Sequence, residues 1–407
     1  MKKAIAFIGL IAGIALLSWV GYGLFVLSRN PAPRFSLPPL PPPPANNAYS
    51  ELISCVTSVR EAGRLITLSQ IPDYGTPAEK EPVLQANREV LRKAQELLQK
   101  ITWVDHLEYR IGDPTVDNYR QLARLFVAQA KSLEQQGKYG QALDTYMDAF
   151  HFFEKVLYGG NGLHLTYQFM AYSEIFPAIP AIISRLSAQD AERGARRLEQ
   201  LLKEEYPLEV LLQQEFRVWL TGWQRIVQEQ SRRGFRLDLP KSDLERTMLY
   251  MPKAPLSEAA KQYVQQWLQQ AMLPYPQQQF VDYPPALQQL EREMVVREPA
   301  GVALIVARYT YVRTRLRLLY TALRLEAYRK THGRYPASLK DLGASPYFND
   351  PFSSKPFVYR PQGNSYVLYS LGPNSQDDGG APFPEGRLRR EQPGDMGLVP
   401  HLPSRPS

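Results

Sequence analysis

The stretch Arg120–Val156, "RQLARLFVAQAKSLEQQGKYGQALDTYMDAFHFFEKV", decides the fold class. Apolar and small side chains recur at every third or fourth position on both sides of Gly137, from Phe126 to Tyr146 and beyond. This spacing places them on one face of a helix, and glycine is favoured where a helix ends. The stretch therefore predicts two helices that turn at Gly137 and pack against each other.

The predicted hairpin at residues 120–156 resembles one tetratricopeptide repeat, in which small residues let two helices pack closely. The proline that usually follows the second helix is missing, and we find no second copy in the chain. Because repeat arrays need about three units to bury their faces, we expect a helical hairpin inside an irregular all-α domain. A peptide-binding array is the alternative.

Helical spacing extends well beyond this hairpin. It runs from Tyr49 to about Arg233, returns in a short helix at Ser257–Met272, and resumes near Leu287. The last segment is interrupted or kinked at Pro299–Gly301 and then continues to about Thr331. We therefore expect a mainly α fold with an irregular helical domain at residues 49–285.

An uncharged run of 24 residues, Ala4–Leu27, follows Lys2 and Lys3. As a helix it is long enough to span the roughly 30 Å hydrocarbon layer of a membrane. A cleaved signal peptide is the competing interpretation, but the run is long for that and no A-x-A cleavage site follows it. We expect a retained signal anchor at residues 1–28, with the N-terminus cytoplasmic and the bulk of the chain exported.

The segment Pro31–Pro44, "PAPRFSLPPLPPPP", is rich in proline. Proline fixes an extended polyproline II backbone, which rises about 3.1 Å per residue. We expect residues 29–48 to form a stiff spacer between the membrane and the folded part. A ligand for SH3-like or WW-like domains is the alternative, but such domains are not expected outside a bacterial membrane.

Composition and motifs exclude several function classes. The chain of 407 residues has a net charge of +8, a mild bias over this length that does not favour a dedicated nucleic-acid role. The single cysteine, Cys55, allows no intramolecular disulfide and is expected to be a small core residue. The five histidines show no metal-ligand spacing, and no nucleophile elbow or phosphate-binding loop is present. No catalytic residue or small-molecule substrate is predicted.

Arginine and lysine are frequent between Arg308 and Lys330, where Glu326 is the single acidic residue. Apolar residues keep helical spacing through the same segment, from Leu316 to Ala327. One face of the helix is therefore expected to pack against the protein and the other to be exposed to solvent. A solvated basic face is our expectation. A surface for anionic lipid or nucleic acid is the alternative.

The spacing of apolar residues is no longer helical after Gly333, where we expect the long helix to end. The runs "KPFVYR" at 355–360 and "NSYVLYSL" at 364–371 are rich in aromatic and β-branched residues, and Pro361–Gly363 separates them. This arrangement predicts a β-hairpin. The C-terminal module is thus expected to be α+β, a long helix followed by a small antiparallel sheet and an irregular loop.

Four blocks in this region carry a resemblance to a known family. They are "TALRLEAYRKTHGRYPASLKDL" from Thr321, "NDPFSSKPFVYR" from Asn349, "YVLYSLGPNSQDDGG" from Tyr366, and "DMG" at Asp395–Gly397. In this order they resemble the C-terminal domain of the type II secretion major pseudopilins. The resemblance implies a pilin-like module, here placed at residues 286–397 with a tail at 398–407. The whole chain also looks like uncharacterised membrane-anchored bacterial proteins that carry this module.

The chain departs from the pseudopilins at its N-terminus. It has no pseudopilin leader or cleavage motif, and more than 250 residues separate the apolar run from the pilin-like helix. We therefore do not expect it to polymerise as those proteins do.

The family's calcium loop corresponds here to residues 371–395. Calcium takes six to eight oxygen ligands from carboxylates, amides, carbonyls and water. Side chains of Asn374, Asp377, Asp378 and Asp395 are the expected ligands, and the resemblance adds the Leu371 carbonyl. Asn374 replaces the family's aspartate, which lowers the charge of the site. A metal-free solvated turn is the alternative. An EF-hand loop is not expected, because the first ligand positions would be neutral and the loop would contain prolines.

Together these observations predict a non-enzymatic, single-pass protein of the bacterial inner membrane, with its bulk on the periplasmic side. Its expected role is interaction or scaffolding with other envelope proteins, linked to a secretion or pilus-like apparatus, with a structural calcium ion. The alternative is an exported helical enzyme that acts on envelope polymers and carries the pseudopilin-like module as an accessory domain.

Overall fold

The computed structural model describes residues 43–104, 115–233, 253–285, 301–384 and 388–398. Close contacts divide the chain into two compact units. The larger unit comprises residues 41–212, 271–278 and 302–407, and the smaller unit comprises residues 1–40, 213–270 and 279–301.

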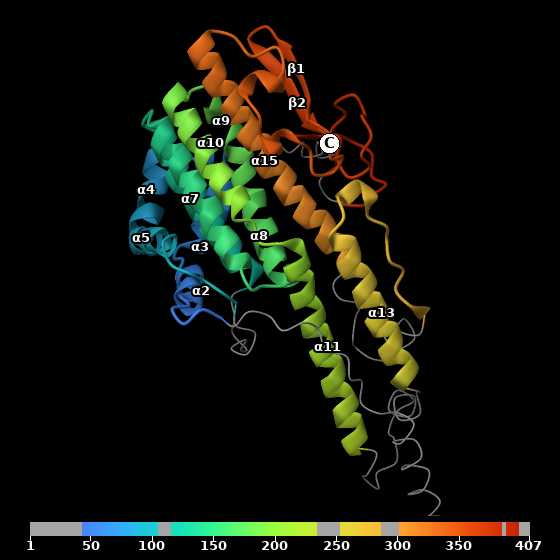
Figure 1. The fold of residues 1–407 in the computed structure, drawn as a ribbon. Coiled ribbons are helices and arrows are strands. Elements are labelled where there is room, and N and C mark those ends of the chain that lie inside the picture. The colour runs from blue at the N-terminus through green and yellow to red at the C-terminus, as the bar shows by residue number, and fades with distance from the viewer. Residues whose placement is uncertain (1–42, 105–114, 234–252, 286–300, 385–387, 399–407) are drawn as a thin grey trace, which may run out of the picture. The chain divides into compact units, whose positions relative to one another are not determined.

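The larger unit is mainly helical, as the apolar spacing predicts (Figure 1). Its α-helices are α2 (Tyr49–Thr57), α3 (Ala62–Ser69), α4 (Pro77–Ala86), α5 (Arg88–Leu97), α6 (Val116–Gln135), α7 (Tyr139–Leu157), α8 (Gly162–Ile175), α9 (Pro180–Ile183), α10 (Ala188–Lys203) and α15 (Val302–His332).

Helices α6 and α7 form the predicted hairpin. Gly137 adopts φ +73°, a left-handed conformation that glycine reaches without strain, and it turns the chain between them. The helices pack against each other and both contact α8. Phe126 and Tyr146 are fully buried in this interface, together with the small residues Ala130 and Ala142. The predicted hairpin is confirmed, whereas its kinship with tetratricopeptide repeats stays a prediction.

Helix α15 is the central element of the larger unit. It packs along α10 and α8 and also contacts β2 (Figure 1). This packing overturns one expectation, because the arginine-rich face is not wholly solvated. Arg313 and Arg315 are 2% and 1% exposed. Neighbours on several sides bury α15, so basic residues that alternate with its apolar residues are enclosed as well.

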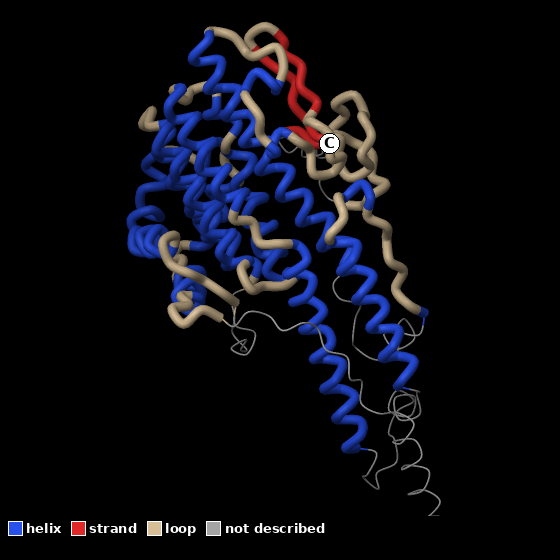
Figure 2. Tube along the Cα trace, viewed as in Figure 1, coloured by secondary structure: helices blue, strands red, loops and turns tan. Residues whose placement is uncertain are grey.

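The predicted hairpin is present and belongs to a three-stranded antiparallel sheet, β1-β2-β3 (Figure 2). The strands are β1 (Val358–Gln362), β2 (Ser365–Ser370) and β3 (Met396–Gly397). Gly363 and Asn364 form the turn, so β1 continues through Pro361, where the sequence suggested that it ended. Proline is tolerated there because β1 is an edge strand.

The smaller unit contains most of α11 (Leu208–Arg233) and of α13 (Lys253–Ala271), the latter matching the short helix predicted at Ser257–Met272. Aromatic side chains hold this unit together. Tyr263 makes edge contacts with Phe216 and Tyr283, with ring centroids 6.1 and 5.3 Å apart.

The predicted membrane anchor at residues 1–28 and most of the spacer at 29–48 lie outside the described residues, as does the tail from 399. Among the helices that are described, none is both long and apolar enough to cross a bilayer. The anchor, the spacer and the predicted domain boundaries stay predictions.

Candidate functional site

The C-terminal loop begins at the end of β2, and Asp350 fixes its position. The Asp350 carboxylate accepts hydrogen bonds from Ser370 Oγ (2.8 Å), the Leu371 backbone N–H (3.1 Å) and the Phe352 backbone N–H (3.0 Å). Burial raises the pKa of Asp350, and the hydrogen bonds oppose this rise. The carboxylate thereby ties the segment before β1 to the start of the loop.

Asp377, the first acidic residue of the loop, faces the sheet. Its Oδ1 accepts from the Tyr369 hydroxyl (2.9 Å) and from the Gly379 backbone N–H (3.0 Å). The bond from Gly379, followed by that from Tyr369, lowers the pKa of Asp377. Arg360 donates to the same tyrosine oxygen at 2.7 Å. Asp377 is thus an ionised, exposed carboxylate held beside β2.

Asp378 and Asp395 link the two ends of the loop. Asp378 Oδ2 accepts from the Gly394 backbone N–H (2.6 Å) and from Asn374 Nδ2 (3.1 Å). Asp395 Oδ2 accepts from the Gly380 backbone N–H (2.6 Å). Each carboxylate therefore binds the backbone next to the other, and residues 378–380 lie against 394–395.

Glycine is required where the two ends of the loop meet. Gly372 has φ +66°, and a Cβ atom there would collide with the Gly394 carbonyl oxygen. Gly394 has φ +122°, and its own Cβ would lie 2.7 Å from Phe383 Cα. The backbone segments therefore touch directly, with no side chain between them.

Asp395 carries the unusual feature of this loop. The residue is only 2% exposed, and its Oδ1 has no hydrogen-bond partner among the described residues. Burial raises the pKa of Asp395, and the negative charges of Asp377 and Asp378 add to the rise, against hydrogen bonds that lower it. A buried carboxylate oxygen without a donor is costly, and a bound cation would remove that cost.

The donor set suits a hard cation in chemistry, although the side chains do not all converge. Asp378, Asn374 and Asp395 come together, whereas Asp377 is turned toward Tyr369. Asn374 Oδ1 accepts from the Gln376 backbone N–H at 3.1 Å. In the part of the chain that is described, no three acidic, histidine or cysteine side chains are grouped closely enough to hold a metal. Asp377 would have to rotate to join a common ion.

Asp350 and Tyr369 were not predicted as site residues, yet they position the loop. The sequence signal for Asp350 is its place before Pro351, in the block that the pseudopilin resemblance already marks. Tyr369 also lies in a marked block. Nothing there singles it out, since a tyrosine in a strand is ordinary.

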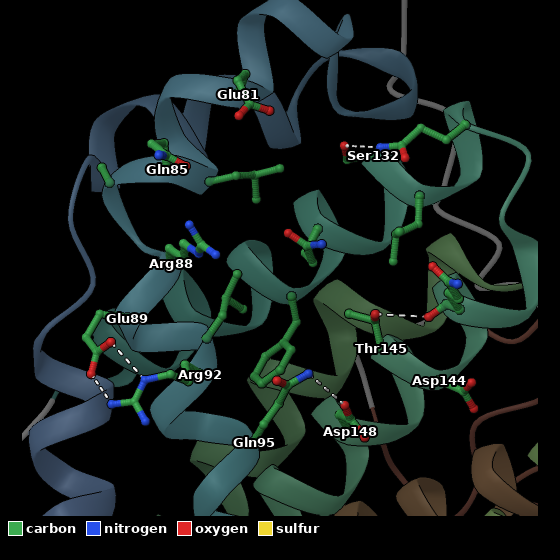
Figure 3. A pocket seen from close by; sticks show the side chains of 18 of the residues that line it. Glu81, Gln85, Arg88, Glu89, Arg92, Gln95, Ser132, Asp144, Thr145 and Asp148 are labelled. Carbon is green, nitrogen blue, oxygen red and sulfur yellow. Dashed lines mark hydrogen bonds and ion pairs between the residues drawn. The ribbon is translucent and has the colours of Figure 1, made fainter.

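A large pocket lies elsewhere, among α4, α5, α6 and α7, with a volume of about 990 Å³ (Figure 3). Its acidic side chains include Glu89, Asp144 and Asp148. Figure 3 shows Glu89 facing Arg92, and the hydrogen bond from that guanidinium lowers the pKa of Glu89.

The two aspartates of this pocket are also held by arginines. Asp144 accepts from Arg193 at 3.0 Å, and Asp148 accepts from Arg197 at 2.6 Å. Gln95 reaches across the pocket toward Asp148 (3.4 Å; Figure 3). Three of the carboxylates in this polar groove therefore lie beside guanidinium groups.

Cys55 is buried, as expected, and its Sγ lies 3.6 Å from the Val90 carbonyl oxygen. Burial raises the pKa of its thiol to about 12. The reactive species of cysteine is the thiolate, so this residue is a core side chain and not an activated nucleophile.

Comparison of the chain with protein-family models, with curated proteins and with solved structures finds no match.

Proposed function

We propose that this protein is a non-enzymatic, membrane-anchored component of the bacterial envelope whose C-terminal pseudopilin-like module is stabilised by a structural calcium ion. Its helical part would contact other envelope proteins of a secretion or pilus-like apparatus. The observation that carries the calcium proposal is the buried Oδ1 of Asp395, which has no hydrogen-bond partner in the part of the chain that is described.

The order of elements supports the pseudopilin-like assignment. A long helix, α15, is followed by the β1-β2 hairpin and then by a loop that returns to the sheet at β3. The same order is implied by the four sequence blocks that resemble the pseudopilins.

The residues proposed to hold calcium are Leu371, through its carbonyl, and the side chains of Asn374, Asp377, Asp378 and Asp395. Calcium would supply positive charge at the point where the two ends of the loop meet. Asp378 and Asp395 already bind the backbone on opposite sides of that point. Neutralising their mutual repulsion would hold residues 378–380 against 394–395.

The polar groove of Figure 3 supports an interaction role over an enzymatic one. Three of its carboxylates are paired with arginines, and Gln85 and Gln95 line it with amides that can both donate and accept. Such a surface suits the backbone of a bound polypeptide better than acid-base chemistry.

Calorimetric melting of the full chain in detergent micelles, with calcium and with a chelator, tests the metal proposal. A ligand at a hundred times its Kd stabilises the folded state by about 2.7 kcal/mol, so calcium should raise the Tm by several degrees. Asp395→Asn should abolish this rise.

Glu391→Gln is the matched control, since it removes an exposed charge four residues before Asp395. It should retain the full response to calcium. A melting temperature that calcium leaves unchanged, or an equal rise in Asp395→Asn, would refute the calcium site.

Alkaline carbonate extraction of membranes from cells that produce the chain tests the anchor. An integral protein stays in the membrane pellet, and deletion of residues 1–28 should release it. Release of the intact chain would contradict the anchor while leaving the calcium result standing.

A further inference from the structure

A second pocket, of about 390 Å³, lies beside α15 within the larger unit. It combines buried polar atoms that have no hydrogen-bond partner among the described residues with an apolar rim. Its lining residues come from the segments 205–209 and 271–278, from α15, and from Pro351. Pockets of this size hold small organic ligands.

The unpartnered polar atoms of this pocket are mostly hydrogen-bond donors. Tyr275 is only 6% exposed, and its hydroxyl has no partner in the described part of the chain. The Nε atoms of Arg317 and Arg313 are likewise buried without a hydrogen bond there. Glu205 Oε2 lies 3.4 Å from Arg313 Nε. The Tyr275 hydroxyl and Arg317 Nε are therefore the two donors that point to a missing acceptor, since buried donors are normally satisfied.

The two arginines of the pocket differ in whether a carboxylate pairs with them. Arg313 is neutralised by Glu154 at 2.7 Å, and Glu205 Oε2 lies 3.4 Å from its Nε. Arg317 instead donates to the neutral carbonyl of Asn349 at 3.2 Å and lies 5.6 Å from the Tyr347 ring centroid. Within the described residues no carboxylate pairs with Arg317.

Arg317 is therefore the residue that needs an anion. Burial lowers its pKa, and the nearby charge of Glu205 offsets this lowering only in part. It stands four residues after Arg313 on α15, so both side chains emerge on the same face of the helix.

One aromatic ring and one guanidinium pack against Tyr275. The Phe352 ring meets it edge-on at 4.8 Å, and the Arg390 guanidinium lies 5.4 Å from its centroid. A rigid ring gives its hydroxyl a defined position, as a specific ligand contact requires.

The rim of the pocket is apolar and open to solvent. Met272 and Leu273 are 71% and 39% exposed, and Leu208 and Pro207 line the pocket with them. Large exposed apolar side chains next to buried donors form an amphipathic site, polar inside and apolar at the mouth.

We propose that this pocket binds the carboxylate of a small organic acid, whose apolar chain lies on Leu208, Met272 and Leu273. The planar anion would accept from the Arg317 guanidinium and from the Tyr275 hydroxyl. Arginine and carboxylate match in geometry and charge. A phosphate dianion fits less well, because it would bring a second negative charge beside Glu205 and Glu209. This proposal is independent of the calcium site.

Isothermal titration of the full chain in detergent micelles with hexanoate tests the proposal. Hexan-1-ol serves as the uncharged probe, acetate as the probe without an apolar chain, and inorganic phosphate as the alternative anion. Hexanoate should bind more tightly than acetate and phosphate, and hexan-1-ol should not bind.

Two variants assign the binding to the pocket. Tyr275→Phe should weaken hexanoate binding about tenfold or more, since it removes a hydrogen bond to a charged group. Because the hydroxyl has no hydrogen-bond partner among the described residues, this change should not lower the Tm. Arg317→Met should reduce the affinity about a hundredfold.

Arg308→Met is the matched control, because Arg308 is also on α15 and burial also lowers its pKa. Arg308 donates to Thr166 Oγ1 at 2.9 Å and does not line the pocket, so its loss should leave hexanoate binding unchanged.

Three results would overturn the proposal: equal affinity for hexan-1-ol, tighter binding of phosphate, or hexanoate binding that Tyr275→Phe does not weaken. The tyrosine variant keeps the test decisive if Arg317→Met fails to fold, since it removes only one oxygen atom.

Discussion

Arg313 of α15 and Glu154 of α7 form a bidentate ion pair in the interior of the larger unit. Nη1 donates to Oε1 at 2.7 Å and Nη2 to Oε2 at 3.1 Å, and both side chains are at most 3% exposed. Burial lowers the pKa of Arg313, but the charge of Glu154 more than offsets this and leaves the pKa well above its ordinary value. The pair joins residues that are 159 positions apart in the sequence.

Removal of either partner should be more damaging than removal of both. Arg313→Met leaves Glu154 as a buried charge without its ion-pair partner, and Glu154→Gln leaves Arg313 with only the longer pair to Glu205. Breaking a buried pair in this way costs about 3–5 kcal/mol of unfolding free energy. The double variant should recover most of that loss, because apolar side chains replace buried ion pairs well. Urea denaturation of the three variants measures the coupling.

The Arg193–Asp144 pair supplies the comparison, since both of its side chains are about one-third exposed. A double-mutant cycle there should give a coupling of about 1 kcal/mol or less. Equal coupling energies for the two pairs would contradict the effect of burial.

Lys80 should stabilise an unusual turn. Asp73, Tyr74 and Gly75 have φ values of 54°, 58° and 75°, so three residues in a row have a positive φ. Their carbonyl oxygens accept from Lys80 Nζ at 3.3, 3.3 and 2.5 Å. Lys80→Met leaves these acceptors without the ammonium and should cost about 1–3 kcal/mol of unfolding free energy.

Urea denaturation measures this effect, with Lys203→Met as the control. Lys203 pairs with Glu199 on the exposed surface of α10, where its side chain is 62% exposed. The control should unfold at the wild-type urea concentration, and an unchanged midpoint for Lys80→Met would show that the turn needs no ammonium.

Cys55 should be unreactive in the folded protein. Its thiol pKa of about 12 leaves almost no thiolate at pH 8, and the residue is fully buried. Labelling with a thiol-specific chromogenic reagent should be slow in buffer and rapid in denaturant. Because the chain has one cysteine, the signal has a single source.

The sign of the pH dependence follows from the raised pKa. The folded state holds the thiol proton more tightly than the unfolded state, whose thiol has an ordinary pKa near 9. Stability should therefore fall as the pH rises from 9 toward 12, and Cys55→Ala should lessen that fall. Rapid labelling of the native protein at pH 8 would contradict the burial.

The secondary structure was predictable where a local pattern determines it. The turn at Gly137, the end of α15 at Gly333 and the hairpin before Ser370 each follow from a few adjacent residues. Pro361 shows the limit. A proline can continue a strand at the edge of a sheet but not one in the middle. The position of β1 at the edge follows from strand pairing, which the local sequence does not determine.

The environment of the α15 arginines was not predictable. A basic run on a helix is usually solvated, but Arg313 meets a carboxylate that lies 159 residues earlier, and Arg315 Nη1 meets the Gly397 carbonyl at 2.9 Å. No local sequence pattern predicts these partners. Likewise, Tyr275 and Arg317 share a pocket only because distant segments fold together.

The packing of α15 along α10 has a consequence for synthesis. A ribosome that has completed α10 has not yet made the helix that covers it, and at 5–20 residues per second the delay is on the order of seconds to tens of seconds. During that interval Glu154 has no arginine from α15 to meet. The nascent chain must therefore be kept from misfolding or aggregating until its last quarter emerges.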